Sequence, residues 1–431
     1  MPSERVAVVG VGYVGLSVAC TLAEAGFETI GVDIDIARVQ TINAGRSPIV
    51  GKEPGLSELL SKVVAEGRLK ASSDILACKR MDAYFLCLDS PISQNKRPIL
   101  DVLRGECVNV GKVMGRDCLV SVESTLPPRT MQDMVIPLLE KNSGMRAGKD
   151  FSVVHCPERV MPGRLLYNMR NYSRVIGGLD KRSVERAKHF YSKLTKGELF
   201  ETDLLSAEIC KTAENAYRDV QIAFANEVAL ICEEAGADAF EVRRLVNTCP
   251  FRDMHTPGAG VGGHCLTKDS WLLVSQVKRA GPSVIADARR LNDLMPVHTA
   301  GLAEEALVEA ERPLKDSRIS VMGLAFLRDS DEIRNSPAMA IIDHFADRAD
   351  VVVHDPFVPE GYRAPLERDL GKALLGSDCA IFVTDHSVYK ELDLMSLKEW
   401  MRTPVIVDGR NIFDGRRCRD LGFIYKGVGK G

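Results

Sequence analysis

The feature that most constrains the fold is a glycine-rich turn between a strand-like segment and a helical one. Arg5–Val9 is a run of mostly small and β-branched apolar residues, and Gly10-Val-Gly-Tyr-Val-Gly15 follows it directly. Helical periodicity then extends over residues 16–25 and closes at Gly26, and residues 29–33 resemble a second strand. This order predicts a β-α-β unit, the building block of a doubly wound α/β domain.

In that context the glycines predict a dinucleotide site. Gly10 permits the tight turn, Gly12 lets the backbone approach a pyrophosphate, and Gly15 lets helix and strand pack closely. The pyrophosphate would lie on the first turn of the helix, at Tyr13 and Val14, where free N–H groups and the helix dipole favour an anion. The alternative is a glycine turn in a domain that binds no nucleotide.

The acidic residue at the end of the second strand indicates which dinucleotide is bound. Asp33 stands eighteen residues after Gly15 and is predicted to accept hydrogen bonds from the adenosine ribose hydroxyls. Its charge repels a 2′-phosphate, so NAD is favoured over NADP. Arg38 is the nearby residue that could hold such a phosphate instead.

The alternation of strand-like and helical segments divides the 431 residues into three domains, at 1–202, 203–305 and 306–431. The first continues with strands near 81–88, 118–122 and 151–155. The second lacks strand-like alternation and shows helices over 206–235, 238–248 and 270–280 around an irregular segment at 256–263. The third returns to strands at 318–324, 350–354, 379–384 and 405–408, with a helix at 336–346 and a mobile tail at 426–431. The predicted fold is α/β, with two Rossmann-like doubly wound domains joined by a central helical domain.

Composition excludes several classes of protein. Fifty-six basic and 59 acidic residues give a net charge of -3, so no nucleic-acid partner is expected. No apolar run approaches the roughly 18 residues of a membrane-spanning helix, and the first residues lack the shape of a signal peptide, which predicts a cytoplasmic protein without a membrane partner. The twelve cysteines are scattered without zinc spacing, so most are expected to be buried thiols and no metal is predicted.

The segment most indicative of chemistry is 257–269, which has four glycines in seven residues and then a cysteine. Cys265 stands beside His264, near Lys268, and at a predicted helix start. Each of these neighbours lowers a thiol pKa, and a nucleophilic thiolate is prepared in this way. The alternative is an inert buried cysteine beside a structural loop.

Other polar residues fall where ligand contacts are expected. Lys211 and Asn215 share a helix face and could offer an ammonium and an amide to an oxyanion, although a solvated helix face is the plainer interpretation. Thr125 and Glu158 follow two predicted strands, and strand-end loops of one sheet converge. Taken singly, both could be ordinary caps or turns, and His155 and His264 are expected to be structural histidines.

Together these motifs resemble the UDP-glucose/GDP-mannose dehydrogenase family over essentially the whole chain. The resemblance rests on GVGYVGL, ESTLPP, CPER, KTAEN, PGAGVGGHC with KD, and GLAF followed by RNSPA. The residues after CPER and the segment 213–227 are most similar to the branch that oxidises UDP-N-acetylmannosamine. The resemblance implies a homodimer formed through the central helical domain.

The resemblance also implies a four-electron oxidation of C6 of a UDP-sugar to a carboxylate, with two NAD consumed and no metal. Cys265 would form a thiohemiacetal and then a thioester, Lys211 and Asn215 would stabilise oxyanions, and Asp269, Thr125 and Glu158 would position water. Ser90, Thr125 and Lys268 would join the cofactor site. Substrate contacts would come from Glu158, Arg159, Val160, Lys211, Asn215, Arg218, Arg252, His255, Gly262, Phe326, Arg334 and Arg410, with Arg252 reaching the neighbouring subunit.

Three positions depart from the family pattern. Leu327 replaces a usual lysine, Asp89 replaces a proline or glycine, and Pro162 replaces a second glutamate of UDP-glucose enzymes. UDP-N-acetylmannosamine is therefore the favoured substrate, with UDP-N-acetylglucosamine, the galactosamine epimer and UDP-glucose as alternatives. A two-electron dehydrogenase of a small hydroxy acid, or a non-catalytic protein that binds NAD or a nucleotide sugar, are further alternatives, and the third domain and Cys265 weigh against them.

Overall fold

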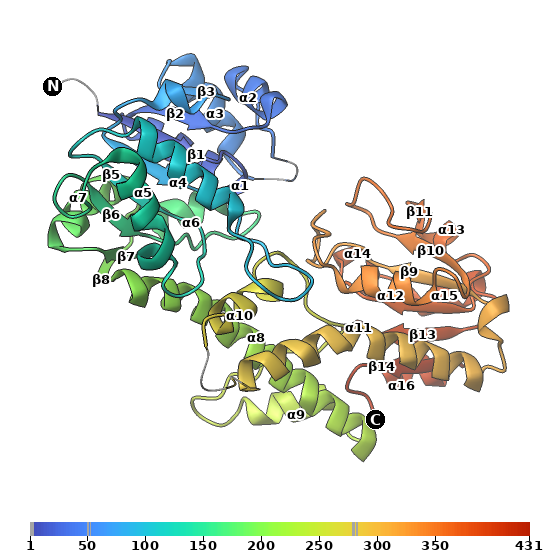
Figure 1. The fold of residues 1–431 in the computed structure, drawn as a ribbon. Helices are drawn as coiled ribbons and strands as arrows, with labels where there is room; N and C mark the ends of the chain where they lie inside the picture. Colours follow the sequence, from blue (N-terminus) through green and yellow to red (C-terminus); the bar gives the residue numbers. More distant parts are fainter. Residues whose placement is uncertain (1–3, 50, 52, 278–280, 282) are drawn as a thin grey trace. The chain divides into compact units, whose positions relative to one another are not determined.

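The computed structural model describes residues 4–49, 51, 53–277, 281 and 283–431 (Figure 1). The chain forms two compact units, one of Met1–Glu214 with Trp271–Lys278 and the other of Asn215–Ser270 with Arg279–Gly431. Each unit holds one sheet of mainly parallel strands, and the helices α8–α11 form the region between the two sheets in the sequence. The predicted fold class is confirmed, whereas the three domain boundaries stay a prediction.

The first unit is built on an eight-stranded sheet, within the described residues, in the order β3-β2-β1-β4-β5-β6-β7-β8. β1 pairs in parallel with β2 and β4, so the predicted β-α-β unit is present and α1 is its crossover helix. The strands are β1 (Arg5–Val9), β2 (Glu28–Val32), β3 (Leu69–Ser72), β4 (Ala83–Leu86), β5 (Leu119–Val122), β6 (Ser152–His155), β7 (Arg174–Gly178) and β8 (Leu199–Asp203).

Helices cover both faces of this sheet because successive strand residues point to opposite sides. Val6 and Val8 pack on the α1, α3, α6 and α7 side, whereas Ala7 and Val9 pack on the α4 and α5 side. The helices and short helical turns are α1 (Tyr13–Glu24), α2 (Ile36–Asn43), α3 (Leu56–Ala65), η1 (Ile75–Cys78), α4 (Asp101–Val113), η2 (Met131–Val135), α5 (Ile136–Ser143), α6 (Leu165–Asn171) and α7 (Lys181–Leu194).

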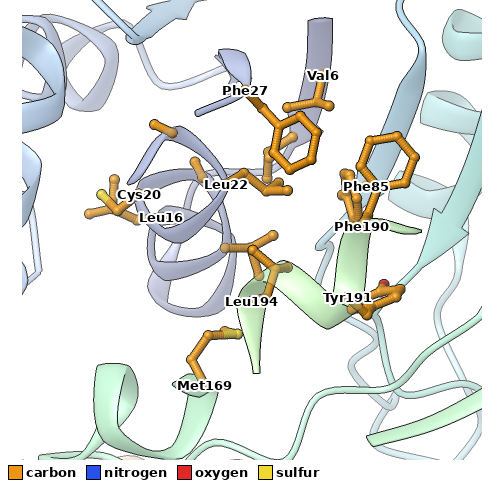
Figure 2. Packing of buried hydrophobic residues seen from close by; sticks show 14 of the residues in the cluster. Val6, Leu16, Cys20, Leu22, Phe27, Phe85, Met169, Phe190, Tyr191 and Leu194 are labelled. Atoms are coloured by element: carbon orange, nitrogen blue, oxygen red, sulfur yellow. The ribbon is translucent and has the colours of Figure 1, made fainter. Parts of the chain in front are cut away.

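Aromatic rings fill the core on the α1 side (Figure 2). The ring of Phe190 lies 5.2 Å from that of Phe27 and 5.9 Å from that of Phe85, and Phe85 also meets Tyr191 at 5.9 Å. Rings at these separations add to the burial of their own surface. This packing joins α7 to β4 and the start of β2, so it holds the crossover unit on the sheet.

One edge of the first sheet differs from the predicted parallel arrangement. β7 pairs with β6 in the antiparallel sense, and β8 is parallel to β7, so both run opposite to the other strands. Neither strand was expected from the sequence. An antiparallel neighbour needs no crossover to the far edge, so residues 156–173, including α6, stay at the carboxyl end of β6.

The central helices differ from the predicted ones in their bounds, and one of them was not predicted. α8 (Leu204–Ala235) confirms the predicted long helix, which ends at Gly236 with a positive φ of 76°. α9 (Ala239–Val246) is capped by Asp238, as expected from the segment 238–248. α10 (Leu266–Val274) begins four residues before the predicted 270–280, whose last part lies outside the described residues. α11 (Ser283–Glu309) was missed, and it contains Pro296.

The second unit carries a fully parallel sheet in the order β11-β10-β9-β12-β13-β14. α11 and α12 pack on one face, and α13, α15 and α16 lie with the core on the other. The elements are η3 (Leu314–Asp316), β9 (Arg318–Met322), α12 (Pro337–Phe345), β10 (Asp350–His354), β11 (Leu366–Glu367), α13 (Leu370–Leu374), β12 (Cys379–Phe382), α14 (Ser387–Lys390), α15 (Leu394–Trp400), β13 (Val405–Asp408), α16 (Gly415–Asp420) and β14 (Ile424–Gly427).

The predicted mobile tail is wrong. β14 pairs with β13, and the backbone N–H of Gly429 donates to a carboxylate oxygen of Glu233 on α8 at 2.6 Å. The carbonyl of Gly429 accepts from the N–H of Ala239 at 2.8 Å. Backbone pairing, which the glycine-rich composition conceals, therefore anchors the end of the chain.

Candidate active site

The glycine-rich turn has the geometry that a dinucleotide phosphate requires. Gly10 has a φ of 85°, and a Cβ on Gly15 would lie 1.8 Å from the carbonyl oxygen of Gly10. A Cβ on Gly12 would instead enter open space at the start of α1, where no side chain caps the helix. The first N–H groups of α1, at Tyr13 and Val14, can therefore face an anion, and the turn fits the pyrophosphate of NAD.

The carboxylate of Asp33 is held at the end of β2 by three donors. It accepts from the N–H groups of Val11 at 3.1 Å and Asp35 at 3.0 Å, and from Arg38 Nη1 at 2.8 Å. Arg38 thus has a carboxylate partner at this site. The arrangement fixes Asp33 beside the glycine turn, as ribose recognition requires.

Three predicted residues of the first unit follow neighbouring parallel strands. Ser90 comes after β4, Thr125 after β5 and Glu158 after β6, and the Ser90 hydroxyl donates to the carbonyl of Thr125 at 2.6 Å. Glu158 accepts from the N–H of Val160 at 2.5 Å, and Val160 packs against the core. The sheet therefore brings these loops to its carboxyl edge. Asp89, in contrast, is exposed.

A buried charge network supports these loops, and sequence reasoning missed it. Glu123, with no exposed surface, accepts from Arg174 Nη1 at 3.0 Å and from the Tyr191 hydroxyl. Its carbonyl also accepts from the N–H of Glu158 at 3.4 Å. Burial raises the pKa of Glu123, against the opposing effect of the Arg174 guanidinium. The sequence signal that could have revealed this network was Glu123, the acidic residue that opens the ESTLPP motif directly after a buried strand.

Glu53 links two parts of the first unit that lie far apart in the sequence. Its carboxylate accepts from the Tyr13 hydroxyl in the glycine turn and from the N–H groups of Gly163 at 2.6 Å and Leu165 at 3.0 Å. Leu165 is the first residue of α6, so Glu53 caps this helix from a distance.

Two further predicted residues lie in the first unit. Arg159 pairs with Glu214 and donates to the carbonyl of Ser173 at 3.3 Å, and Lys211 is buried.

The second unit brings together the residues of the predicted reactive segment, 257–269. Cys265 precedes α10, and its carbonyl accepts from the N–H groups of Lys268 and Asp269 at 3.1 and 2.9 Å, which confirms the predicted helix start. The fully buried carboxylate of Asp269 accepts from Lys268 Nζ at 2.7 Å and from Asn215 Nδ2 at 2.6 Å. Cys265 itself is partly buried. A thiol, an ammonium, a carboxylate and an amide thus belong to one local structure.

The glycines before Cys265 let the loop pack against the carboxyl edge of the second sheet. A Cβ on Gly262 would lie 2.4 Å from Cβ of Phe326, and Gly263 has a φ of 91°. The N–H of Gly263 donates to the carbonyl of Arg334 at 2.8 Å, and Arg410 Nη2 donates to the carbonyl of Gly260 at 3.2 Å. Because a Cβ at position 262 would overlap the side chain of Phe326, this position requires glycine.

The remaining predicted substrate residues also lie in the second unit. Arg334 pairs with Glu332 at 2.5 Å, and Arg328 pairs with Asp385, beside the exposed Leu327. Burial lowers the pKa of His255, and the nearby Arg218 charge lowers it further. Arg252 is exposed next to Phe251, which is 100% exposed and has a φ of 64°.

Buried histidine and cysteine side chains also lie outside this segment. His155 is fully buried and its Nδ1 lies 2.9 Å from the carbonyl of Val122; burial lowers its pKa to about 4. Eight of the twelve cysteines are buried. Within the described stretches, no three His, Cys, Asp or Glu side chains gather as a metal ion would need. Across the same stretches, the helices are too short or too polar to cross a lipid bilayer.

Comparison with known proteins agrees with this geometry. Three models of the UDP-glucose/GDP-mannose dehydrogenase family match the chain: the NAD binding domain at 4–195, the central domain at 205–294 and the UDP binding domain at 320–415. UDP-N-acetyl-D-mannosamine dehydrogenase of Pyrococcus horikoshii is 39% identical over 428 residues, which is 99% of each chain.

Solved structures of nucleotide-sugar dehydrogenases superpose on this chain over almost its whole length. The UDP-D-ManNAc dehydrogenase of P. horikoshii superposes with a TM-score of 0.93 at 38% identity, covering 99% of this chain and 100% of that one. NDP-N-acetyl-D-galactosaminuronic acid dehydrogenase from Methanosarcina mazei superposes with a TM-score of 0.89 at 36% identity, covering 100% and 96%.

The fold and its two nucleotide-binding domains define an NAD-dependent nucleotide-sugar dehydrogenase. The UDP binding domain implies that the substrate is a UDP-sugar. The chain belongs to the UDP-glucose/GDP-mannose dehydrogenase family, as the sequence motifs predict.

Proposed function

We propose that this chain oxidises C6 of a UDP-N-acetylhexosamine to the carboxylate, with UDP-N-acetyl-D-mannosamine as the favoured substrate and UDP-N-acetyl-D-mannosaminuronate as the product. The observation that carries the proposal is the start of α10, where Cys265 precedes the hydrogen-bonded set of Lys268, Asp269 and Asn215. The P. horikoshii relative named for UDP-N-acetyl-D-mannosamine supports the choice of sugar.

The glycine turn at Gly10–Gly15 and Asp33 would hold NAD, together with Arg38, Ser90, Thr125 and Lys268. When bound, NAD supplies a hydride acceptor. The work of the protein is then to keep the aldehyde from escaping between two oxidations. The Cys265 thiolate adds to the C6 aldehyde and takes up a proton as the thiohemiacetal, whose carbon can lose a second hydride.

Loss of that hydride leaves a thioester, and water then breaks the C–S bond. The balance is one CH2OH group, two NAD⁺ and one water giving one carboxylate, two NADH and three protons, with the thiol regenerated. We assign the oxyanion of each tetrahedral species to Lys211 and to the second N–H of the Asn215 amide, because the first already holds Asp269. Asp269, Thr125 and Glu158 are assigned to the hydrolytic water.

Different residues would bind the two ends of the substrate. We assign the sugar to Glu158, Arg159, Val160, Arg218, His255 and Gly262, and the diphosphate and uridine to Phe326, Arg334 and Arg410. Pro162, in place of a second glutamate, leaves Glu158 as the single acid of that pair and disfavours UDP-glucose. Arg328 would stand in for the cation lost at Leu327, although it pairs with Asp385.

We further propose that the central helices form a homodimer. Tyr217, Phe224 and Ile231 recur at intervals of seven along α8 and are 66%, 55% and 60% exposed. A helix face with this apolar spacing is typical of a helix–helix contact. Arg252, exposed near the end of α9, would then serve the sugar site of the neighbouring subunit.

The test is the ratio of NADH formed to sugar consumed, measured with UDP-N-acetylmannosamine, UDP-N-acetylglucosamine, UDP-N-acetylgalactosamine, UDP-glucose and GDP-mannose. Two NADH per UDP-N-acetylmannosamine, with slower turnover of the other sugars, is expected. A higher kcat/KM for another sugar would replace the substrate. One NADH per sugar would remove the covalent route, and no NADH with any sugar would favour a binding protein.

A further inference from the structure

A buried polar network lies behind the reactive segment and takes no part in the chemistry above. Its centre is Asp219 on α8, which has no exposed surface. The carboxylate accepts from Ser270 Oγ at 3.0 Å, Arg289 Nη1 at 2.5 Å and Asn292 Nδ2 at 2.8 Å. Ser270 belongs to α10 and the other two to α11, and all three are at most 1% exposed. One carboxylate therefore joins three helices.

The same network extends along α8 to the other end of the reactive segment. Asn226, two turns beyond Asp219, donates to Asn292 Oδ1 at 2.8 Å and accepts from the N–H of Gly258 at 2.9 Å. Arg289 Nη1 also lies 3.5 Å from the carbonyl of Leu266. The contacts fall at Gly258, where the glycine loop begins, at Leu266, directly after Cys265, and at Ser270, directly after Asp269.

We infer that Asp219, with Arg289, Asn292 and Asn226, is a positioning device that holds Cys265 and Asp269 in register. The inference rests on the proposed function, because positioning matters where a thiol must capture an aldehyde. The segment needs external anchors because it is rich in glycine: Gly260 and Gly263 have φ values of 133° and 91°, and glycine restricts the backbone least.

Stability alone does not explain why the charged side chains of Asp219 and Arg289 are both buried. Apolar side chains of similar volume are often as stabilising as a buried ion pair, since desolvation offsets the attraction between the charges. The side chains of Asp219, Arg289, Asn292 and Asn226 instead hydrogen-bond to one another and to the backbone of the reactive segment, with Nε of Arg289 left without a hydrogen-bond partner among the described residues. A buried polar network of this kind constrains how the elements that it joins are arranged.

Ser270→Ala tests the inference with the smallest change, because it removes the hydrogen bond between α10 and Asp219 and leaves the Asp219–Arg289 pair intact. Thr299→Ala is the matched control, because Thr299 is also fully buried and its hydroxyl donates to the carbonyl of Met295 at 2.9 Å within α11. Both variants lose one buried hydroxyl hydrogen bond, so their Tm values are expected to fall by similar amounts.

The first measurement is the alkylation rate of Cys265 by iodoacetamide in the enzyme without substrate, followed by mass spectrometry of its peptide across pH. Ser270→Ala is expected to change the rate severalfold and to shift its pH midpoint, whereas Thr299→Ala should match the unaltered protein. Indistinguishable alkylation profiles for the two variants would overturn the inference, whatever the enzyme turns over.

The second measurement is NADH per sugar in the presence of semicarbazide, which traps released aldehyde. Ser270→Ala is expected to release aldehyde, to fall from two NADH toward one, and to lose on the order of tenfold or more in carboxylate formation, because an ångström of misplacement is costly at a reacting atom. If the unaltered protein itself gives one NADH, the proposed function fails, and the alkylation comparison still decides whether Asp219 positions the thiol.

Discussion

The Asn215 amide nitrogen lies 2.6 Å from a carboxylate oxygen of Asp269, although the two residues are 54 positions apart. Lys268 holds the other oxygen of the same carboxylate at 2.7 Å. The carboxylate four residues after Cys265 is thus fixed from two sides, by α8 and by its own helix. Protein groups alone fix its orientation, which is the preorganisation that oxyanion and water chemistry require.

Removal of the thiol should separate binding from chemistry. In Cys265→Ala, carboxylate formation is expected to fall by roughly 10³-fold or more, as is usual when a nucleophile is lost. NAD affinity should be unchanged, since the glycine turn is intact. Product analysis and NAD titration would check both, and full carboxylate formation by the variant would end the covalent proposal.

Replacement of Asp33 should weaken the cofactor site. Asp33→Ala removes a charged acceptor, for which about 1.5–3 kcal/mol is typical, so the Kd for NAD is expected to rise about tenfold or more. Asp35→Ala is the matched control, because Asp35 caps α2 through the N–H of Arg38 and should alter stability with little effect on NAD. Equal Kd values for the two variants would contradict the assignment of the ribose to Asp33.

The Glu123–Arg174 pair should be essential for stability. Glu123→Ala leaves the Arg174 guanidinium buried without its partner, and breaking such a pair costs about 3–5 kcal/mol. Denaturant unfolding would measure the loss. Asp133→Ala removes the exposed partner of Arg129 and should leave the midpoint almost unchanged. A midpoint shift as small as that of the control would show that Glu123 is dispensable.

Stability should depend on the protonation of His155. Its pKa is lowered from 6.5 to about 4 by burial, so between these values the unfolded chain binds a proton that the folded chain does not. The contribution is fully present above pH 6.5 and is lost as the pH falls toward 4, by about 3 kcal/mol in all. Unfolding of the unaltered protein and His155→Gln should therefore converge on acidification, and parallel pH profiles would refute this.

The exposed apolar face of α8, formed by Tyr217, Phe224 and Ile231, should control dimer formation. Phe224→Lys introduces a charge between Tyr217 and Ile231 and is expected to convert a dimer into monomers in sedimentation velocity. Leu76→Lys, at a 53% exposed site on η1, is the control and should leave assembly unchanged. A Phe224→Lys protein that still sediments as a dimer would move the interface elsewhere.

The glycine turn and Asp33 can be predicted from local sequence because their determinants are local. Gly10, Gly12, Gly15 and Asp33 lie within one β-α-β unit, where the turn, the helix start and the strand end are dictated by short-range sterics. For the same reason the start of α10 at Cys265 could be expected from its neighbours. The glycine turn and the proposed nucleophile could both be predicted without any knowledge of the rest of the chain.

The tertiary structure alone decided which distant groups meet. The reversal of β7 and β8, the pairing of the last residues as β14, and the contacts of Asp219 with Arg289 and of Glu123 with Arg174 join residues that are tens of positions apart. Each depends on how whole elements pack, because a buried charge finds its partner through the fold and carries no periodic signal of its own. The sequence by itself therefore determined the family and predicted the reactive residues, and the packing of α8, α10 and α11 decided how those residues are held.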